Sequence, residues 1–296
     1  MTFGRSTPRR VGLRRLVTEA GAVMLGLVLL MWTAMPVYTM LLIALDPEEG
    51  EVEFSGNLWP PEPSLESFRV VLTQDARYLE HFWRQLGNSL YIGLSTMALT
   101  VLIASLASFA VGRMRRGRRS LLNAAAVLTN ASLLTYAIPS SFLIFPFHRI
   151  MHEYGLSDDP WAVIAAQVTF ATPFAILILR QYARLIPIEL DDAARVDGAS
   201  SVQVYRRVYL PLMTPALAVV GTYALVLAWN DYLYQFVLLS SERHMTAAVM
   251  QAQLFDDADA PWNAMMAAAI IYALPPVAIF LALRRVMMSA LTRRWR

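Results

Sequence analysis

The chain has 296 residues, of which 57% are hydrophobic and only 16% are charged, with a formal net charge of +3 and a mean hydropathy of +0.45. A soluble domain of this length needs more charge on its surface, so the composition favours an integral membrane protein. The sequence has no cysteine and no lysine, which excludes a disulfide framework, a thiolate metal site and a standard P-loop ATPase, whose lysine binds the nucleotide phosphates.

Six apolar segments are long enough to cross the ~30 Å hydrocarbon core of a bilayer, which takes about 20 helical residues. The predicted spans are residues 20–45, 85–112, 120–148, 160–180, 208–241 and 260–284. The sequence therefore predicts an all-α integral membrane protein, with a single transmembrane domain of six helices over residues 20–288. The first span is longer than the apolar core of a signal peptide, so we expect an uncleaved anchor.

Arginine is distributed unequally between the two faces that these spans define. Twenty of the 25 arginines lie in the amino-terminal tail, between spans two and three, after span four and at the carboxy-terminal end. The positive-inside rule therefore predicts that the tails 1–19 and 289–296 are both cytoplasmic. Residues 46–84 are then extracytoplasmic and form either an acidic surface lid or a docking face for an external partner, and residues 180–211 form a cytoplasmic loop.

The loop between spans four and five has signals for two short helices joined at a glycine. Pro187 suits a first helical turn, and the acids that follow it favour the positive end of the helix dipole. Gly198 is suited to the left-handed conformation that ends a helix. Ser200 or Ser201 can cap a second helix, before Pro211 begins the next span. These signals fit an ordinary amphipathic interfacial loop as well as a rigid element that transmits force to a cytosolic partner.

This loop resembles the EAA loop of ABC-importer permeases, whose core is E-A-A, three residues and G, closed by leucine-proline. Here Asp192-Ala193-Ala194 stands for E-A-A, Asp197-Gly198-Ala199 for the step at glycine and Leu210-Pro211 for the close. Asp192 departs from the usual glutamate by one methylene but keeps the charge. The likeness covers nearly the whole chain and is greatest to the second permease of maltose-type carbohydrate importers. Supporting motifs are Trp59-Pro60, Asn88-Ser89, Gly112-Arg113 and Trp229-Asn230-Asp231.

The resemblance implies a transport subunit, not an enzyme, in the plasma (inner) membrane of a bacterium or archaeon. It implies half of a translocation pathway for a sugar or oligosaccharide, with a second permease, two ATPase subunits or domains and an extracytoplasmic solute-binding protein as partners. This chain would bind no cofactor, since the partner ATPase uses the ATP and Mg. The coupling-helix residues implied are Glu189, Asp192, Ala193, Ala194, Asp197, Gly198, Ala199, Arg206 and Pro211.

Two alternatives stay open at this point. The first is a permease of the same kind for a polyol, glycerol phosphate or another solute that is not a sugar. The second is an ion-coupled secondary transporter, which needs coupling carboxylates near the midplane and repeated halves. The sequence has one acid within a span and no obvious internal repeat, so the ABC permease is the preferred interpretation.

Asp231 is that acid, and a charge near the bilayer centre costs roughly 2.5–3.5 kcal/mol. It should therefore face a cavity, a partner or the outer interface. The candidate residues of the pathway are Tyr223, Trp229, Asn230 and Asp231, whose rings and amides suit a sugar. An aromatic belt at the membrane surface explains such residues equally well, and we prefer it for Tyr232 and Tyr234. The polar residues Asn130, Tyr136 and Gln167 either line the path or hold helices together.

No catalytic or metal site is expected. His148 and His152 are four residues apart, but apart from Glu153 no third ligand is apparent and the HExxH motif is absent. Ser140-Ser141, beside Pro139, is interpreted as packing and not as a nucleophile. We expect contacts with membrane lipid and none with nucleic acid.

Overall fold

The computed structural model describes residues 13–47, 59–113, 127, 134–135, 138–256 and 260–293. Within these ranges every regular element is a helix, which confirms the predicted all-α class. Five helices are long and apolar enough to cross a membrane: Val17–Ala44, Arg77–Val111, Pro160–Ala183, Ser201–Trp229 and Trp262–Met287. Most of the predicted third span, 120–148, lies outside the described residues, so the count of six spans stays a prediction.

The chain divides into two compact units, which are described separately. The first unit runs to Leu72 and includes Pro261–Ile270. It contains α1 (Leu13–Ala44), most of α2 (Glu66–Thr73) and the start of α12 (Trp262–Arg293). The Asn263 amide donates to the Asp46 carbonyl over 3.1 Å. Apolar side chains are exposed along α1, as expected of a helix that faces lipid.

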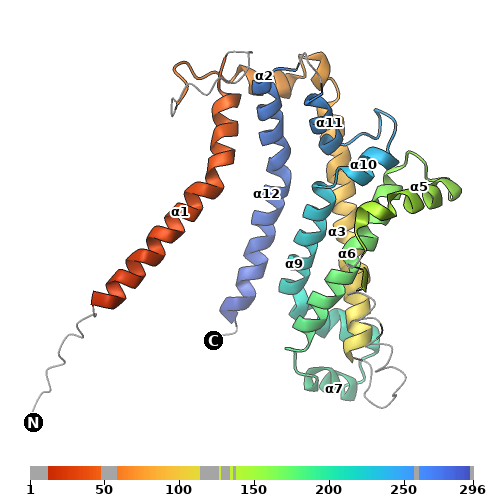
Figure 1. Ribbon diagram of the computed structural model, residues 1–296. Helices are drawn as coiled ribbons and strands as arrows, with labels where there is room; N and C mark the ends of the chain where they lie inside the picture. The colour runs from red at the N-terminus through yellow and green to blue at the C-terminus, as the bar shows by residue number, and fades with distance from the viewer. Residues whose placement is uncertain are drawn as a thin grey trace, which may run out of the picture. The chain divides into compact units, whose positions relative to one another are not determined.

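The second unit comprises Thr73–Ala260 and Ile271–Arg296, and three long helices form its centre. These are α3 (Phe82–Arg113), α6 (Pro160–Ala183) and α9 (Leu210–Trp229), which pack against one another along their lengths (Figure 1). Small residues allow α3 and α9 to approach closely, as is usual between membrane helices. A Cβ on Gly93 of α3 would lie 2.9 Å from Leu225 Cδ1, and one on Gly221 of α9 would lie 3.4 Å from Met97 Cγ.

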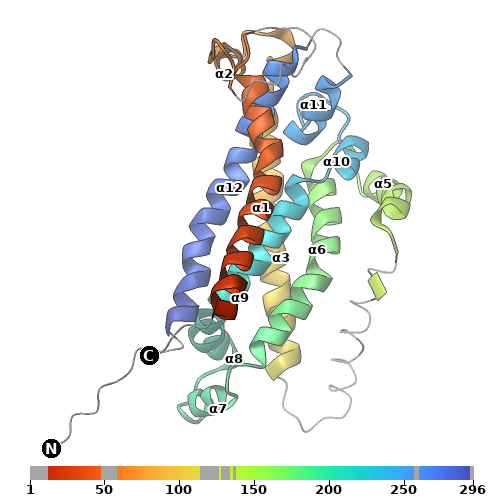
Figure 2. The ribbon, with the colours of Figure 1, turned by 60° about the vertical axis from the view of Figure 1, so that its left-hand side comes forward.

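Shorter helices lie at the two ends of this unit (Figures 1 and 2). At one end are α7 (Glu189–Val196) and α8 (Ser201–Val204). At the other are the 3-10 turn η1 (Arg77–Leu79), α5 (Ile144–Glu153), α10 (Leu233–Leu238) and α11 (Ala247–Leu254), with the 3-10 turn η2 (Ser140–Leu143) before α5. The candidate site is built from elements at both ends of the unit, and α9 runs between them.

The loop between α10 and α11 is tied to its neighbours by polar side chains. Asp158, which has a positive φ of 56°, accepts hydrogen bonds from the Ser240 and Ser241 amides over 2.8 and 3.0 Å. Burial alone would raise the pKa of Asp158, but the hydrogen bonds from Ser241 and Ser240 and the nearby His244 hold it below its ordinary value.

Asn88 and Ser89 of α3 hold the same loop from the other side. The Asn88 amide donates to the carbonyls of Arg243 and Met245 over 2.9 and 2.8 Å. Ser89 Oγ accepts from the Ala247 amide over 3.0 Å and so satisfies a free N–H at the start of α11. The Asn-Ser pair noted in the sequence therefore fixes where α11 begins.

Two predicted spans differ from the structure. The third, 120–148, is not one helix, because the chain is non-helical at Ile138–Pro139 and α5 follows as a separate helix. Proline lacks an N–H and disfavours helix at the residue before it, which accounts for this break. The fifth, 208–241, is interrupted in its carboxy-terminal part: the helix ends at Trp229 and α10 begins at Leu233.

Candidate functional site

The first part of the site is the loop around α7, and its local geometry follows from its sequence. Acidic side chains lie in the first turn of α7, where they oppose the helix dipole. At its end the Gly198 amide donates to the Arg195 carbonyl and the Ala199 amide donates to the Ala194 carbonyl, over 3.0 and 2.9 Å. This is the Schellman pattern, which requires a positive φ at the residue after the cap, and Gly198 has a φ of +83°.

The helix after the glycine is capped as the sequence suggests. Ser200 Oγ accepts from the Gln203 amide over 3.3 Å, and Gln203 Oε1 accepts from the Ser200 amide over 2.7 Å. This reciprocal pair is a capping box. Among the two serines that the sequence offered, Ser200 is the cap.

The prediction of a second short helix that ends before Pro211 is wrong. From α8 the chain passes through one π-helical turn, Tyr205–Tyr209, directly into α9, so helix is continuous from Ser201 to Trp229. Proline has no N–H to donate, so it is tolerated best near the start of a helix. Here Pro211 lies inside the continuous helix, directly after the wider π turn. The second helix of the loop is therefore the end of a long helix.

Aromatic side chains of the π turn anchor it on α3. The rings of Tyr205 and Tyr209 lie 5.2 and 5.1 Å from that of Phe109. Their hydroxyls bond to Ser105 and Ser108 Oγ at 2.7 and 3.0 Å. Tyr209 is fully buried, so the long helix is fixed to α3 immediately beyond the loop.

Most of the predicted coupling residues lie on α7 or in the turn that follows it, at the surface of the second unit. All of them are exposed except Ala194 and Ala199, which are half-buried. Val196, at the end of α7, is 88% exposed. Arg206 and Pro211 lie on the long helix and not on α7, so the structure divides the set between two elements.

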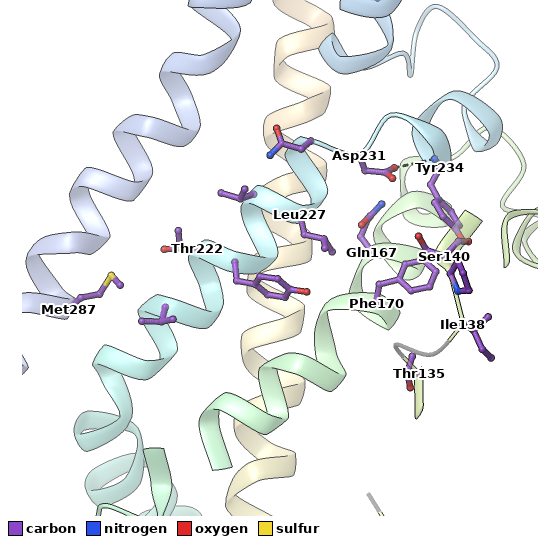
Figure 3. A pocket seen from close by; sticks show the side chains of 15 residues that line it. Thr135, Ile138, Ser140, Gln167, Phe170, Thr222, Leu227, Asp231, Tyr234 and Met287 are labelled. Carbon is purple, nitrogen blue, oxygen red and sulfur yellow. Dashed lines mark hydrogen bonds between the residues drawn. The ribbon is translucent and has the colours of Figure 1, made fainter. Parts of the chain in front are cut away.

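The second part of the site is an open pocket of about 850 Å³ (Figure 3). Its walls come from the segment around η2, from α6, from α9 and α10, and from α12. The lining residues are Thr135, Ile138, Pro139, Ser140, Gln167, Phe170, Val219, Thr222, Tyr223, Val226, Leu227, Asn230, Asp231, Tyr234 and Met287. The pocket is apolar over most of its wall, with a small number of polar groups, as solute sites usually are.

The structure brings three of the four predicted pathway residues to this pocket. Tyr223, Asn230 and Asp231 line it. Trp229 does not: its ring stacks on that of Tyr272 of α12 at 5.1 Å, and its carbonyl accepts from the Tyr272 hydroxyl over 2.5 Å. Trp229 lines, together with Asn230, a separate cavity of about 310 Å³ beside α12.

Asp231 is placed by the interruption between α9 and α10. Its Oδ2 accepts hydrogen bonds from the Tyr234 and Gln235 amides over 3.2 and 3.3 Å, so the carboxylate caps α10. The buried side chain of Gln167 on α6 hydrogen-bonds to the same carboxylate, and both residues line the pocket on the same side (Figure 3). A polar residue within an apolar stretch thus marks the point where the helix stops.

The prediction that Tyr234 belongs to an aromatic belt is wrong. Tyr234 is 2% exposed and lines the pocket. Tyr232 is 41% exposed, and its ring stacks on Phe236 at 5.2 Å, which is compatible with a place at the membrane surface. Of the polar residues considered for the path, Gln167 lines the pocket, whereas Asn130 and Tyr136 lie outside the described residues.

Several lining residues were not among the candidates chosen from the sequence. Val219, Thr222 and Val226 precede Asn230 at helical spacing, so the period of α9 could have identified them. Phe170 and Ser140 come from other elements, and no local pattern marks them. Among the described residues, no group of three or more His, Asp or Glu is arranged to hold a metal ion, and His152 Nδ1 lies 2.9 Å from Ser157 Oγ.

Comparisons with known proteins agree over most of the chain. The family described as "Binding-protein-dependent transport system inner membrane component" matches residues 101–293. The inner membrane ABC transporter permease protein YcjP of Escherichia coli (strain K12) is 30% identical over 88% of this chain and 90% of its own length. The trehalose transport system permease protein SugB of Mycobacterium tuberculosis (strain CDC 1551 / Oshkosh) is 30% identical over 88% of this chain and 91% of its own length.

A solved structure shares the fold. It is a chain from the crystal structure of a bacterial ABC transporter involved in the import of the acidic polysaccharide alginate. The TM-score is 0.73 at 22% identity, and the match covers 94% of this chain and 99% of that one. The described helices of this chain are therefore arranged as in a chain of that transporter.

Proposed function

Because this chain belongs to the family of inner membrane components of binding-protein-dependent transport systems, we propose that it is the permease subunit of an ATP-driven importer of a sugar or oligosaccharide. It forms one half of the translocation pathway, and a second permease forms the other half. A separate ATPase hydrolyses ATP with Mg, and this chain binds no cofactor.

One observation carries the proposed coupling: a single continuous helix joins the α7 loop to the pocket. The helix begins at Ser201, three residues after Gly198, and ends at Trp229, next to Asn230 and Asp231. A displacement of α7 is passed to this helix through the short Gly198 joint, and the helix carries it to the pocket wall. The loop 187–211 is therefore the proposed contact with the ATPase.

The direction of the chain across the membrane supports the same assignment. The end of the second unit that carries α7 also carries Arg184, Arg195, Arg206 and Arg207, and the positive-inside rule assigns such an end to the cytoplasm. α7 then lies on the cytoplasmic side of the membrane, where the ATPase can bind it. Tyr234 of α10 lines the pocket, and α10 lies at the other end of the unit, where we expect an extracytoplasmic binding protein to deliver the solute.

The solute class rests on relatives and on the chemistry of the pocket. The relative from Mycobacterium tuberculosis is named for trehalose, a sugar. The pocket offers the ring of Tyr223, the hydroxyls of Thr222 and Tyr234 and the amides of Gln167 and Asn230. Rings stack on the C–H faces of pyranoses, while hydroxyls and amides bond to sugar hydroxyls.

Co-purification tests the proposal. The tagged chain is purified in a mild detergent, and the proteins that accompany it are identified by mass spectrometry. Recovery of a P-loop ATPase and a second permease is expected. A chain that is recovered alone, and that transports solute in liposomes without ATP, would show instead that it is a secondary transporter.

A further inference from the structure

The pocket has an unbalanced charge. Among the described residues that line it, Asp231 is the one with a formal charge, and the others are apolar side chains, hydroxyls and amides. None of the described lining residues is basic. The sequence contains no lysine and has no arginine in 120–148, 160–179 or 208–241; α12, which contributes Met287, carries Arg284 and Arg285, but neither of these lines the pocket. The described lining therefore gives an anionic solute no cation with which to pair.

The carboxylate is also held in place. Tyr234 and Gln235 donate to Oδ2 from the backbone of α10, and Gln167 donates from α6. Because two backbone donors belong to the first turn of α10, the carboxylate cannot turn away from the pocket without uncapping that helix. The same donors offset part of the cost of burying the carboxylate.

We propose that Asp231 determines specificity, as a fixed negative charge that makes the pathway accept uncharged polyhydroxylated solutes and reject anionic ones. This inference rests on the proposed function as a solute permease. Repulsion between like charges is stronger beside the apolar walls of this pocket than in bulk water. A sugar hydroxyl, in contrast, can donate to the carboxylate. The inference disfavours glycerol phosphate among the solutes considered above.

Paired probes test this directly. The complex of this chain with its partner subunits is placed in nanodiscs without binding protein or nucleotide. Lactose and maltotriose are each compared with the derivative in which one primary hydroxyl is oxidised to a carboxylate. Binding is measured by saturation-transfer NMR with competition at low salt. The neutral member of each pair should bind about tenfold or more tightly than its acid, and Asp231→Asn should bring the two affinities to within about threefold.

The control substitution is Asp158→Asn. Asp158 also caps backbone amides at the α10 end of the unit, but it does not line the pocket, so the same loss of charge there should leave the ratio of affinities unchanged. Equal binding of neutral and acidic probes by the unaltered complex, or a ratio that persists in Asp231→Asn, would overturn the inference and leave the permease function standing. Failure of both neutral sugars and both acids to bind would overturn the inference and the proposed sugar class together.

Discussion

The hydroxyl of Tyr234 donates a hydrogen bond to the carbonyl of Ser140 over 2.6 Å, although 94 residues separate them in the chain. The Tyr234 ring also packs edge-on against Phe147 and Phe170, at 5.8 and 5.2 Å between centroids. Ser140 begins the 3-10 turn η2 before α5, so this hydrogen bond ties α10 to the start of that turn. The contact closes one wall of the pocket.

Removal of that hydroxyl should weaken the wall. Tyr234→Phe keeps the ring contacts but leaves the Ser140 carbonyl without this donor, which should cost about 1–2 kcal/mol of folding free energy. The thermal denaturation midpoint of the purified complex should fall. Tyr232→Phe is the control, because Tyr232 is exposed, and its midpoint should stay unchanged. Equal midpoints for both variants would contradict the assigned role of Tyr234.

Gly198→Val should uncouple transport from ATP hydrolysis. Gly198 has a φ of +83°, and a β-branched side chain in that region costs roughly 1–3 kcal/mol, although nothing lies within 4 Å of the added Cβ. The strain should distort the joint between α7 and the long helix. ATP-driven uptake by the reconstituted complex should fall at least about tenfold, while the amount of protein in the membrane changes little.

A second glycine provides the matched control for that experiment. Gly155 lies between α5 and α6, has a φ of +71° and likewise has nothing within 4 Å of an added Cβ. Gly155→Val therefore imposes similar strain away from the proposed coupling element and should retain most of the uptake. Normal uptake with Gly198→Val, or equal losses in both variants, would argue against the coupling role.

Ser200→Ala should loosen the first turn of the long helix. It removes the side chain that accepts from the Gln203 amide, and loss of a cap of this kind costs about 1 kcal/mol. Hydrogen exchange of the Gln203 amide, which loses its acceptor, and of the Val204 amide, which bonds to the Ser200 carbonyl, should accelerate about fivefold. In Ser201→Ala the capping box remains, so exchange there should be close to that of the unaltered chain. No difference between the two variants would show that the capping box does not hold this turn.

Gly93→Ala should disturb the contact between α3 and α9. The new methyl would lie 2.9 Å from Leu225 Cδ1, so Leu225 must move, and overpacking of this kind costs roughly 1–3 kcal/mol. The denaturation midpoint should fall. Gly87→Ala on the same helix meets nothing within 4 Å, so its midpoint should not fall. A stable Gly93→Ala variant would mean that the two helices approach less closely than described.

The long helices could be predicted from the sequence because the length of an apolar run is local information. The helix end at Gly198 and the cap at Ser200 were predictable for the same reason, since each depends on residues within one turn. Hydropathy alone could not show that the helix after Ser200 continues unbroken past Pro211. That continuity depends on Tyr205 and Tyr209, whose contacts are about 100 residues away on α3.

The pocket was harder to predict because its walls come from distant parts of the chain. Tyr223, Asn230 and Asp231 were found because they are polar or aromatic residues in an apolar segment. Trp229 was chosen on the same grounds, but its direction is set by Tyr272 of α12, which no local pattern identifies. The burial of Tyr234 likewise depends on a carbonyl 94 residues away.

The proposed coupling depends on contact between α7 and a separate ATPase, which cysteine cross-linking can detect. The natural chain has no cysteine, so a single one introduced as Val196→Cys reports only on the end of α7, where the side chain is 88% exposed. Tyr154→Cys, 78% exposed beyond α5, is the control. We predict that a short bifunctional reagent joins Val196→Cys, and not Tyr154→Cys, to an ATPase subunit in membranes, and that ATP changes the yield. No cross-link from Val196→Cys, or an equal one from Tyr154→Cys, would show that α7 is not the contact with the ATPase.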